Sequence, residues 1–76
     1  MWPTLVLVLV LVFQSNYYEM GLKALDEKRY PAAVENFINA IAAEPKDFSL
    51  HFNLALAYSL QGKDAEAIPE YKKASR

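Results

Sequence analysis

The chain lacks the side chains on which most enzyme and metal sites depend. It contains no cysteine, one histidine and two glycines. The absence of cysteine excludes a disulfide framework and a thiolate metal site, and it leaves the redox compartment undetermined. Two separated glycines form no glycine-rich phosphate loop, and the serines have no partners of triad type. We therefore predict a chain that is not an enzyme and has no cofactor or metal, in which His51 is a packing residue.

An excess of charge of one sign is also missing. Eight basic and nine acidic side chains give a formal net charge of -1. This balance provides no basic surface for phosphates, so we expect no nucleic-acid partner. The length of 76 residues allows one small domain.

Charge is absent altogether from residues 1–18, which include the tract TLVLVLVLVF at residues 4–13. As a strand the tract has high β-propensity, but the rest of the chain reads as helical and offers no partner strand. Its length suits a secretory signal, but no Lys or Arg precedes it, and Phe13 and Ser15 make a poor cleavage site. We treat residues 1–13 as an apolar N-terminal segment, either an anchor or a truncated signal, and favour a helix.

The helical alternatives differ in where the tract lies. Residues 5–13 as a helix reach about 14 Å, against a hydrocarbon core of roughly 30 Å. Residues 1–18 reach roughly 27 Å, with Trp2 and Tyr17-Tyr18 at the two ends like interfacial belts. Membrane anchoring through residues 1–18 and packing of the tract onto the rest of the chain both stay open. The expected localisation is accordingly membrane-associated or cytoplasmic.

The remainder of the chain has the apolar spacing of helices. The sequence predicts four of them, at residues 15–28, 31–44, 48–61 and 65–75. Asp47 is predicted to cap the third helix and Asp64 the fourth, each offering a carboxylate to the free N–H groups of the first turn. Pro69 removes a backbone donor within the fourth helix, which predicts a bend or a delayed start.

The helical part of the chain repeats itself after 34 residues. Small residues fall on small ones and aromatic residues on aromatic ones: Gly21 on Ala55, Ala33 on Ala67, Val34 on Ile68, Phe37 on Tyr71, and Ala40 on Ala74. This pattern resembles the tetratricopeptide repeat, a helix–turn–helix unit of the same period. The resemblance implies an all-α superhelix with a first repeat at residues 14–47. The second repeat, at residues 48–76, is incomplete at its C-terminus.

The repeat pattern assigns packing roles to small and large residues. Gly21 and Ala33 are small so that the two helices of a hairpin approach closely, and Phe37 is large to fill the space between hairpins. The family usually has an aromatic residue where this chain has His51 and a tyrosine where it has Ala24. We expect looser packing at both positions.

A second stripe lies beside the packing stripe on the first helix of each repeat. In proteins that this chain resembles, that face lines a concave groove for an extended peptide or a partner helix. Its members here are Tyr18, Leu22 and Leu25 in the first repeat, and Phe52, Asn53, Leu56 and Ser59 in the second. Asn53 matches an asparagine that holds a peptide backbone in many such grooves. Tyr18 and Leu22 replace residues of the carboxylate clamp, which excludes that variant.

The resemblance predicts a non-catalytic protein–protein interaction scaffold with a protein or peptide partner. The alternative is a structural module whose repeats only mediate self-association, with the stripe covered by the same chain or by a second copy. Arrays of this kind normally need three or more repeats and a polar cap. We expect Tyr58, Ile68 and Tyr71 to be partly uncovered, so that the chain either belongs to a longer array or forms a homo-oligomer.

Overall fold

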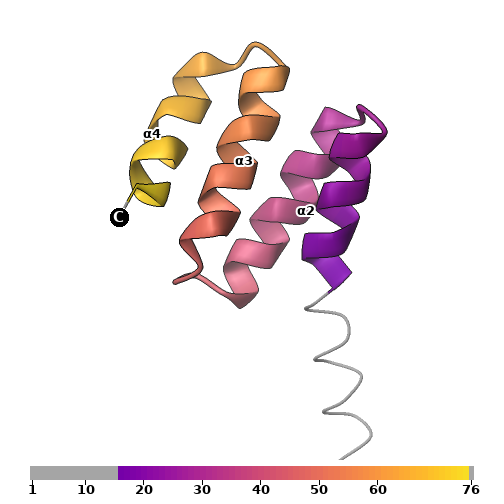
Figure 1. Cartoon of the computed structure of the whole chain (residues 1–76), viewed down its shortest axis with the longest axis horizontal. Helices are drawn as coiled ribbons and strands as arrows, with labels where there is room; N and C mark the ends of the chain where they lie inside the picture. Colours follow the sequence, from indigo (N-terminus) through magenta and orange to yellow (C-terminus); the bar gives the residue numbers. More distant parts are fainter. Residues whose placement is uncertain (1–15, 76) are drawn as a thin grey trace, which may run out of the picture.

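The computed structural model describes residues 16–75, and its regular structure in that range is entirely helical. A helix at residues 16–26 is followed by α2 (Tyr30–Ala43), α3 (Phe48–Leu60) and α4 (Asp64–Ala74). The helices form a row in which α3 packs against both α2 and α4 (Figure 1). The predicted all-α fold is confirmed. The apolar segment at residues 1–13 lies outside the described residues.

The same turn closes both helical hairpins. Lys28 and Gly62 both have left-handed backbone conformations, with φ angles of 61° and 74°. Two backbone hydrogen bonds fix the turns: Arg29 N–H to Ala24 O at 2.8 Å, and Lys63 N–H to Tyr58 O at 2.9 Å. Each of these positions lies 34 residues from its counterpart, so the turn repeats with the sequence. The left-handed residue also explains why the first helix ends at residue 26 rather than at the predicted residue 28.

The start of α3 agrees with the prediction. Asp47 is its N-cap, and the Asp47 Oδ1 accepts hydrogen bonds from the backbone N–H and the hydroxyl of Ser49, at 3.0 and 2.6 Å. This carboxylate satisfies one of the free N–H groups of the first turn.

The start of α4 differs from the prediction that Asp64 caps it. The N-cap is Lys63, which makes no side-chain cap, and its carbonyl already accepts from Ala67 N–H at 3.0 Å. Asp64 is therefore the first helical residue, where its negative charge interacts favourably with the helix dipole. The helix continues through Pro69. The alternative of a delayed start was therefore wrong.

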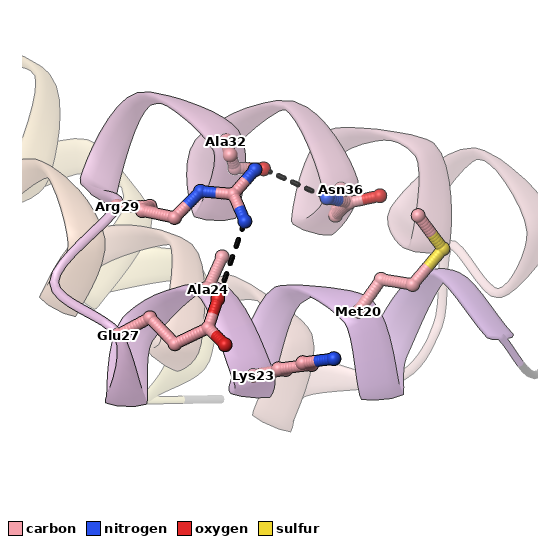
Figure 2. Close-up of a pocket in the computed structure, with 7 residues that line it drawn as sticks. All are labelled: Met20, Lys23, Ala24, Glu27, Arg29, Ala32 and Asn36. Carbon is pink, nitrogen blue, oxygen red and sulfur yellow. Dashed lines mark hydrogen bonds and ion pairs between the residues drawn. The ribbon is translucent and has the colours of Figure 1, made fainter.

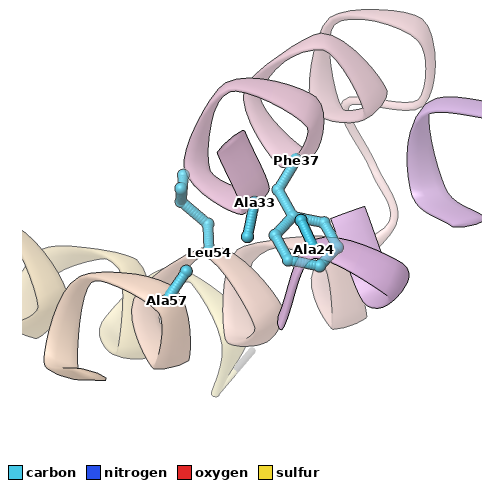
Figure 3. Packing of buried hydrophobic residues seen from close by; sticks show 5 residues of the cluster. All are labelled: Ala24, Ala33, Phe37, Leu54 and Ala57. Atoms are coloured by element: carbon cyan, nitrogen blue, oxygen red, sulfur yellow. The ribbon is translucent and has the colours of Figure 1, made fainter. Parts of the chain in front are cut away.

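A small core joins the first hairpin to α3. Five buried residues form it (Figure 3): Ala24, Ala33, Phe37, Leu54 and Ala57. Phe37 has no exposed surface, and its ring lies where a Cβ atom on Gly21 would come within 2.6 Å of it. Glycine is thus required by the close approach of the ring, and Phe37 fills the junction between the first hairpin and the next helix, as predicted.

The second hairpin has no equivalent cover on its outer side within the described residues. Tyr58 is half-buried, whereas Ile68 and Tyr71 are exposed, which confirms the uncovered surface that the repeat pattern predicted. Within residues 16–75, no helix combines the length and apolar character needed to cross a membrane.

Candidate functional site

The first half of the predicted stripe lies on the helix at residues 16–26. Tyr18 and Leu22 are 39% and 38% exposed, respectively, although both are large and apolar. Leu25 differs because it is half-buried and packs against the core cluster. Tyr18 and Leu22 are therefore the residues of this half that offer apolar surface to a partner.

The second half of the stripe lies on α3. Phe52 is 51% exposed, while Leu56 and Ser59 are half-buried. Asn53 is also half-buried, and its side-chain amide makes no hydrogen bond to any other residue of the range 16–75. Within that range, its donors and its acceptor are therefore available for a backbone segment of a partner.

Both aromatic residues of the stripe are held from behind by another ring. The Tyr18 and Phe37 ring centroids lie 6.5 Å apart, and the Phe52 and Tyr71 centroids lie 5.7 Å apart. The two pairs are 34 residues apart, so the repeat places one aromatic contact twice. Tilted and edge-on aromatic contacts of this kind are favourable. They reduce the freedom of the exposed rings before any partner arrives.

Ser59 is less available than the other members of the stripe. Its hydroxyl lies 3.3 Å from the Tyr71 hydroxyl, and either group can act as the donor. This contact ties the end of α3 to α4. Ser59 therefore contributes to the support of the stripe as much as to its surface.

A hollow of about 200 Å³ lies elsewhere, between the helix at residues 16–26 and α2 (Figure 2). An exposed ion pair between Arg29 and Glu27, at 3.2 Å, lies at one end of it. None of the predicted stripe residues contributes to its lining, which consists of Met20, Lys23, Ala24, Glu27, Arg29, Ala32 and Asn36. The hollow adjoins Ala24, one of the two positions where the sequence predicts looser packing.

The sequence analysis missed a polar cluster between α3 and α4. The His51 Nδ1 lies 2.8 Å from the Glu70 Oε1, and the Lys73 Nζ donates to the Glu70 Oε2 at 3.2 Å. Burial alone would raise the pKa of Glu70, but the hydrogen bonds from His51 and Lys73 lower the pKa of this carboxyl below its ordinary value. Since the side chains of His51 and Glu70 are largely buried, the pair connects the two helices of the second hairpin.

This cluster has the character of a structural contact. Among residues 16–75, no group of three or more His, Cys, Asp or Glu side chains is arranged to hold a metal ion. The repeat register contained a signal for the contact, because His51 and Glu70 are the counterparts of Tyr17 and Asn36 on the two helices of the first hairpin. Residues that face each other in one hairpin are expected to do so in the next.

Comparisons with known proteins agree with the repeat geometry. Residues 18–76 match a family model described as tetratricopeptide repeat. No curated protein and no solved structure matches the chain. The match covers both helical hairpins and the turn between them.

Proposed function

The chain belongs to the tetratricopeptide repeat family, whose members generally mediate protein–protein interactions, and we propose that it is a non-catalytic scaffold that binds a partner on the stripe. The ligand is an extended peptide or a partner helix with apolar side chains. It contacts Tyr18, Leu22, Phe52 and Leu56, and its backbone bonds to Asn53.

The exposure of large apolar residues carries this proposal. Tyr18, Leu22 and Phe52 are each more than a third exposed, although the core is built from another face of the same helices. Single exposed apolar residues are common, but several on one face are typical of an interaction surface. The helix at residues 16–26 and α3 contribute to the same core cluster, which fixes their two half-stripes on one rigid unit.

The composition of the stripe specifies the chemistry of the partner. The seven stripe positions include no charged residue, so an ionic contact does not select the ligand. Aromatic and leucine side chains favour apolar anchors at helical or extended spacing. Asn53 adds an amide that donates and accepts at once, which suits the N–H and C=O groups of one peptide unit.

Selection from a displayed peptide library on the full-length chain tests the proposal. An isolated apolar peptide is expected to lose at least about a hundredfold in affinity for Leu22→Glu, because the substitution places a charge in a desolvated contact. Fluorescence anisotropy with the labelled peptide gives the dissociation constants, and circular dichroism verifies that the variant is folded.

Ile38→Glu provides the matched control. Ile38 lies on α2, is 46% exposed and is outside the stripe. We expect this variant to bind the selected peptide with the affinity of the unsubstituted chain. A folded Leu22→Glu variant that binds equally well, or a Leu22→Glu variant that unfolds, contradicts the proposal; unfolding would show that the stripe belongs to the core.

A further inference from the structure

Equivalent positions of α2 and α4 differ sharply in exposure. Phe37 on α2 is fully buried, whereas its counterpart Tyr71 on α4 is 36% exposed. Val34 packs against the core cluster, whereas its counterpart Ile68 is 53% exposed. The cause is α3, which covers α2; among the described residues, no helix covers α4 in the same way.

The uncovered residues form one face of α4. Asp64, Ile68 and Tyr71 are spaced i, i+4 and i+7, and Lys72 and Ala65 flank them. All five are exposed, and we call them the α4 face. Asp64 lies four residues before Ile68 and Lys72 four residues after it, so the charges are arranged symmetrically about an apolar centre.

We propose that the α4 face binds the α4 face of a second copy of the chain, with the two helices antiparallel and a two-fold axis at Ile68. This arrangement places Ile68 against its own counterpart and Asp64 against Lys72 of the second copy. It also places the small Ala65 against Tyr71 of the second copy. Each half of a two-fold interface must complement itself, and the order acidic–apolar–basic along α4 does so only when the helices are antiparallel.

The charges of the chain exclude two other ways of pairing copies. Parallel α4 helices would bring Asp64 against Asp64 and Lys72 against Lys72. Head-to-tail stacking would place the helix at residues 16–26 of one copy where α3 packs against α2. The residues that α3 buries there are Leu50, Leu54 and Ala57, and their counterparts are Asn16, Met20 and Lys23. Head-to-tail stacking would therefore bury an unpaired lysine.

The size of the face predicts a weak dimer. Helix α4 has eleven residues and offers one side of about three turns, which is less than the surface of a standard stable interface. We expect association that rises with concentration. Experiments on the full-length chain in mild detergent therefore need a chemical trap and a charge-based control.

Cysteine trapping tests the position of the axis, and the chain has no native cysteine to interfere. Oxidation of Ile68→Cys is expected to give disulfide-linked dimers at least tenfold faster than oxidation of Ile38→Cys, which is similarly exposed on α2. Association through the N-terminal tract or through the stripe would affect both variants alike. Equal rates for the two variants would overturn the proposal.

Charge exchange tests the antiparallel register. Asp64→Lys and Lys72→Asp each place like charges in contact, and each is expected to lower trapping in the Ile68→Cys background at least threefold. In an equimolar mixture, the first variant has two basic ends on its α4 face and the second has two acidic ends, so trapping between the two chains is expected to recover. Failure of the mixture to recover trapping contradicts the register. Leu22→Glu, which tests the proposed function, is expected to leave trapping unchanged.

Discussion

Two single residues carry an unusual backbone conformation that the rest of the fold imposes. Lys28 and Gly62 occupy the same position of the hairpin turn, with φ angles of 61° and 74°. Glycine adopts this conformation freely, whereas a residue with a Cβ atom is strained by roughly 1–2 kcal/mol. The chain therefore contains the strained and the relaxed version of one turn.

Lys28→Gly is expected to raise the free energy of unfolding by up to about 1 kcal/mol, because it removes the strain at the end of the first helix. Gly62→Ala is expected to lower it by about 1 kcal/mol. No atom lies within 4 Å of a Cβ built on Gly62, so this loss is a backbone effect. Urea unfolding followed by circular dichroism measures both. Lys28→Ala, which keeps the strain, is the control and should change little.

Gly21 is constrained by its neighbour rather than by its backbone. A Cβ atom at this position would lie 2.6 Å from the ring of Phe37, which is fully buried and has no room to withdraw. Gly21→Ala is therefore expected to destabilise by about 1–3 kcal/mol, although alanine favours a helix. In a Phe37→Leu background the same substitution should cost less, and a double-mutant cycle measures the difference. A Gly21→Ala variant as stable as the original chain would refute this packing.

At the scale of the element, the second hairpin is joined by a polar contact that the first lacks within the described residues. His51 of α3 and Glu70 of α4 take the places that Tyr17 and Asn36 have in the first hairpin. The looser packing expected at His51 is therefore compensated by a hydrogen bond to a largely buried carboxylate. Hydrogen bonds to charged groups contribute more to stability than neutral ones.

Glu70→Gln is expected to destabilise the chain by about 1 kcal/mol at neutral pH. The pKa of Glu70 is lower in the folded chain than its ordinary value of 4.5, so the carboxylate stabilises the fold above that pH. This contribution is lost as the pH falls through the folded pKa, where the carboxyl becomes protonated. Urea unfolding from pH 7 to pH 3 should therefore show the two curves converging at acidic pH. Glu35→Gln, at an exposed position of α2, should follow the unsubstituted chain throughout.

At the scale of the whole molecule, the described part of the chain and its N-terminal segment have different characters. Residues 16–75 form a helical unit with its own core, while residues 1–18 carry no charged side chain. We propose that residues 1–18 attach the scaffold to a membrane surface, a hypothesis that rests on the sequence alone.

Flotation with liposomes tests this attachment. The full-length chain is expected to rise with the vesicles, and a chain lacking residues 1–15 is expected to remain in the soluble fraction. Circular dichroism of the shortened chain verifies that its helices are retained. Recovery of both chains in the soluble fraction would argue that the tract packs on the repeats instead.

The sequence predicted much of this fold because its period and its spacing act together. The register of Gly21 on Ala55 and Phe37 on Tyr71 places every helix within a few residues of its observed bounds. Details that depend on one hydrogen bond were less accessible. Asp64 was expected to be a cap because aspartate favours that position, but the carbonyl of Lys63 closes the helix one residue earlier.

The stripe was predictable only in part, since spacing identifies a face but not its accessibility. Tyr18, Leu22 and Phe52 are exposed, whereas Leu25 packs on the core and Ser59 contacts Tyr71. These two contacts depend on how the hairpins are tilted, which the spacing of residues along one helix does not contain. The ring pairs behind Tyr18 and Phe52 depend on the same tilt.

The row of helices implies an order of opening along the chain. Helix α2 packs against α3 and shares the core cluster with the helix at residues 16–26, whereas α4 packs against α3 alone among the described helices. In a linear array, stability is a sum of contacts between neighbours, so the element with one neighbour opens at the smallest cost. Amide protons of α4 should therefore exchange with deuterium sooner than those of α2. A second copy bound to α4 would slow its exchange and make the two hairpins more equal.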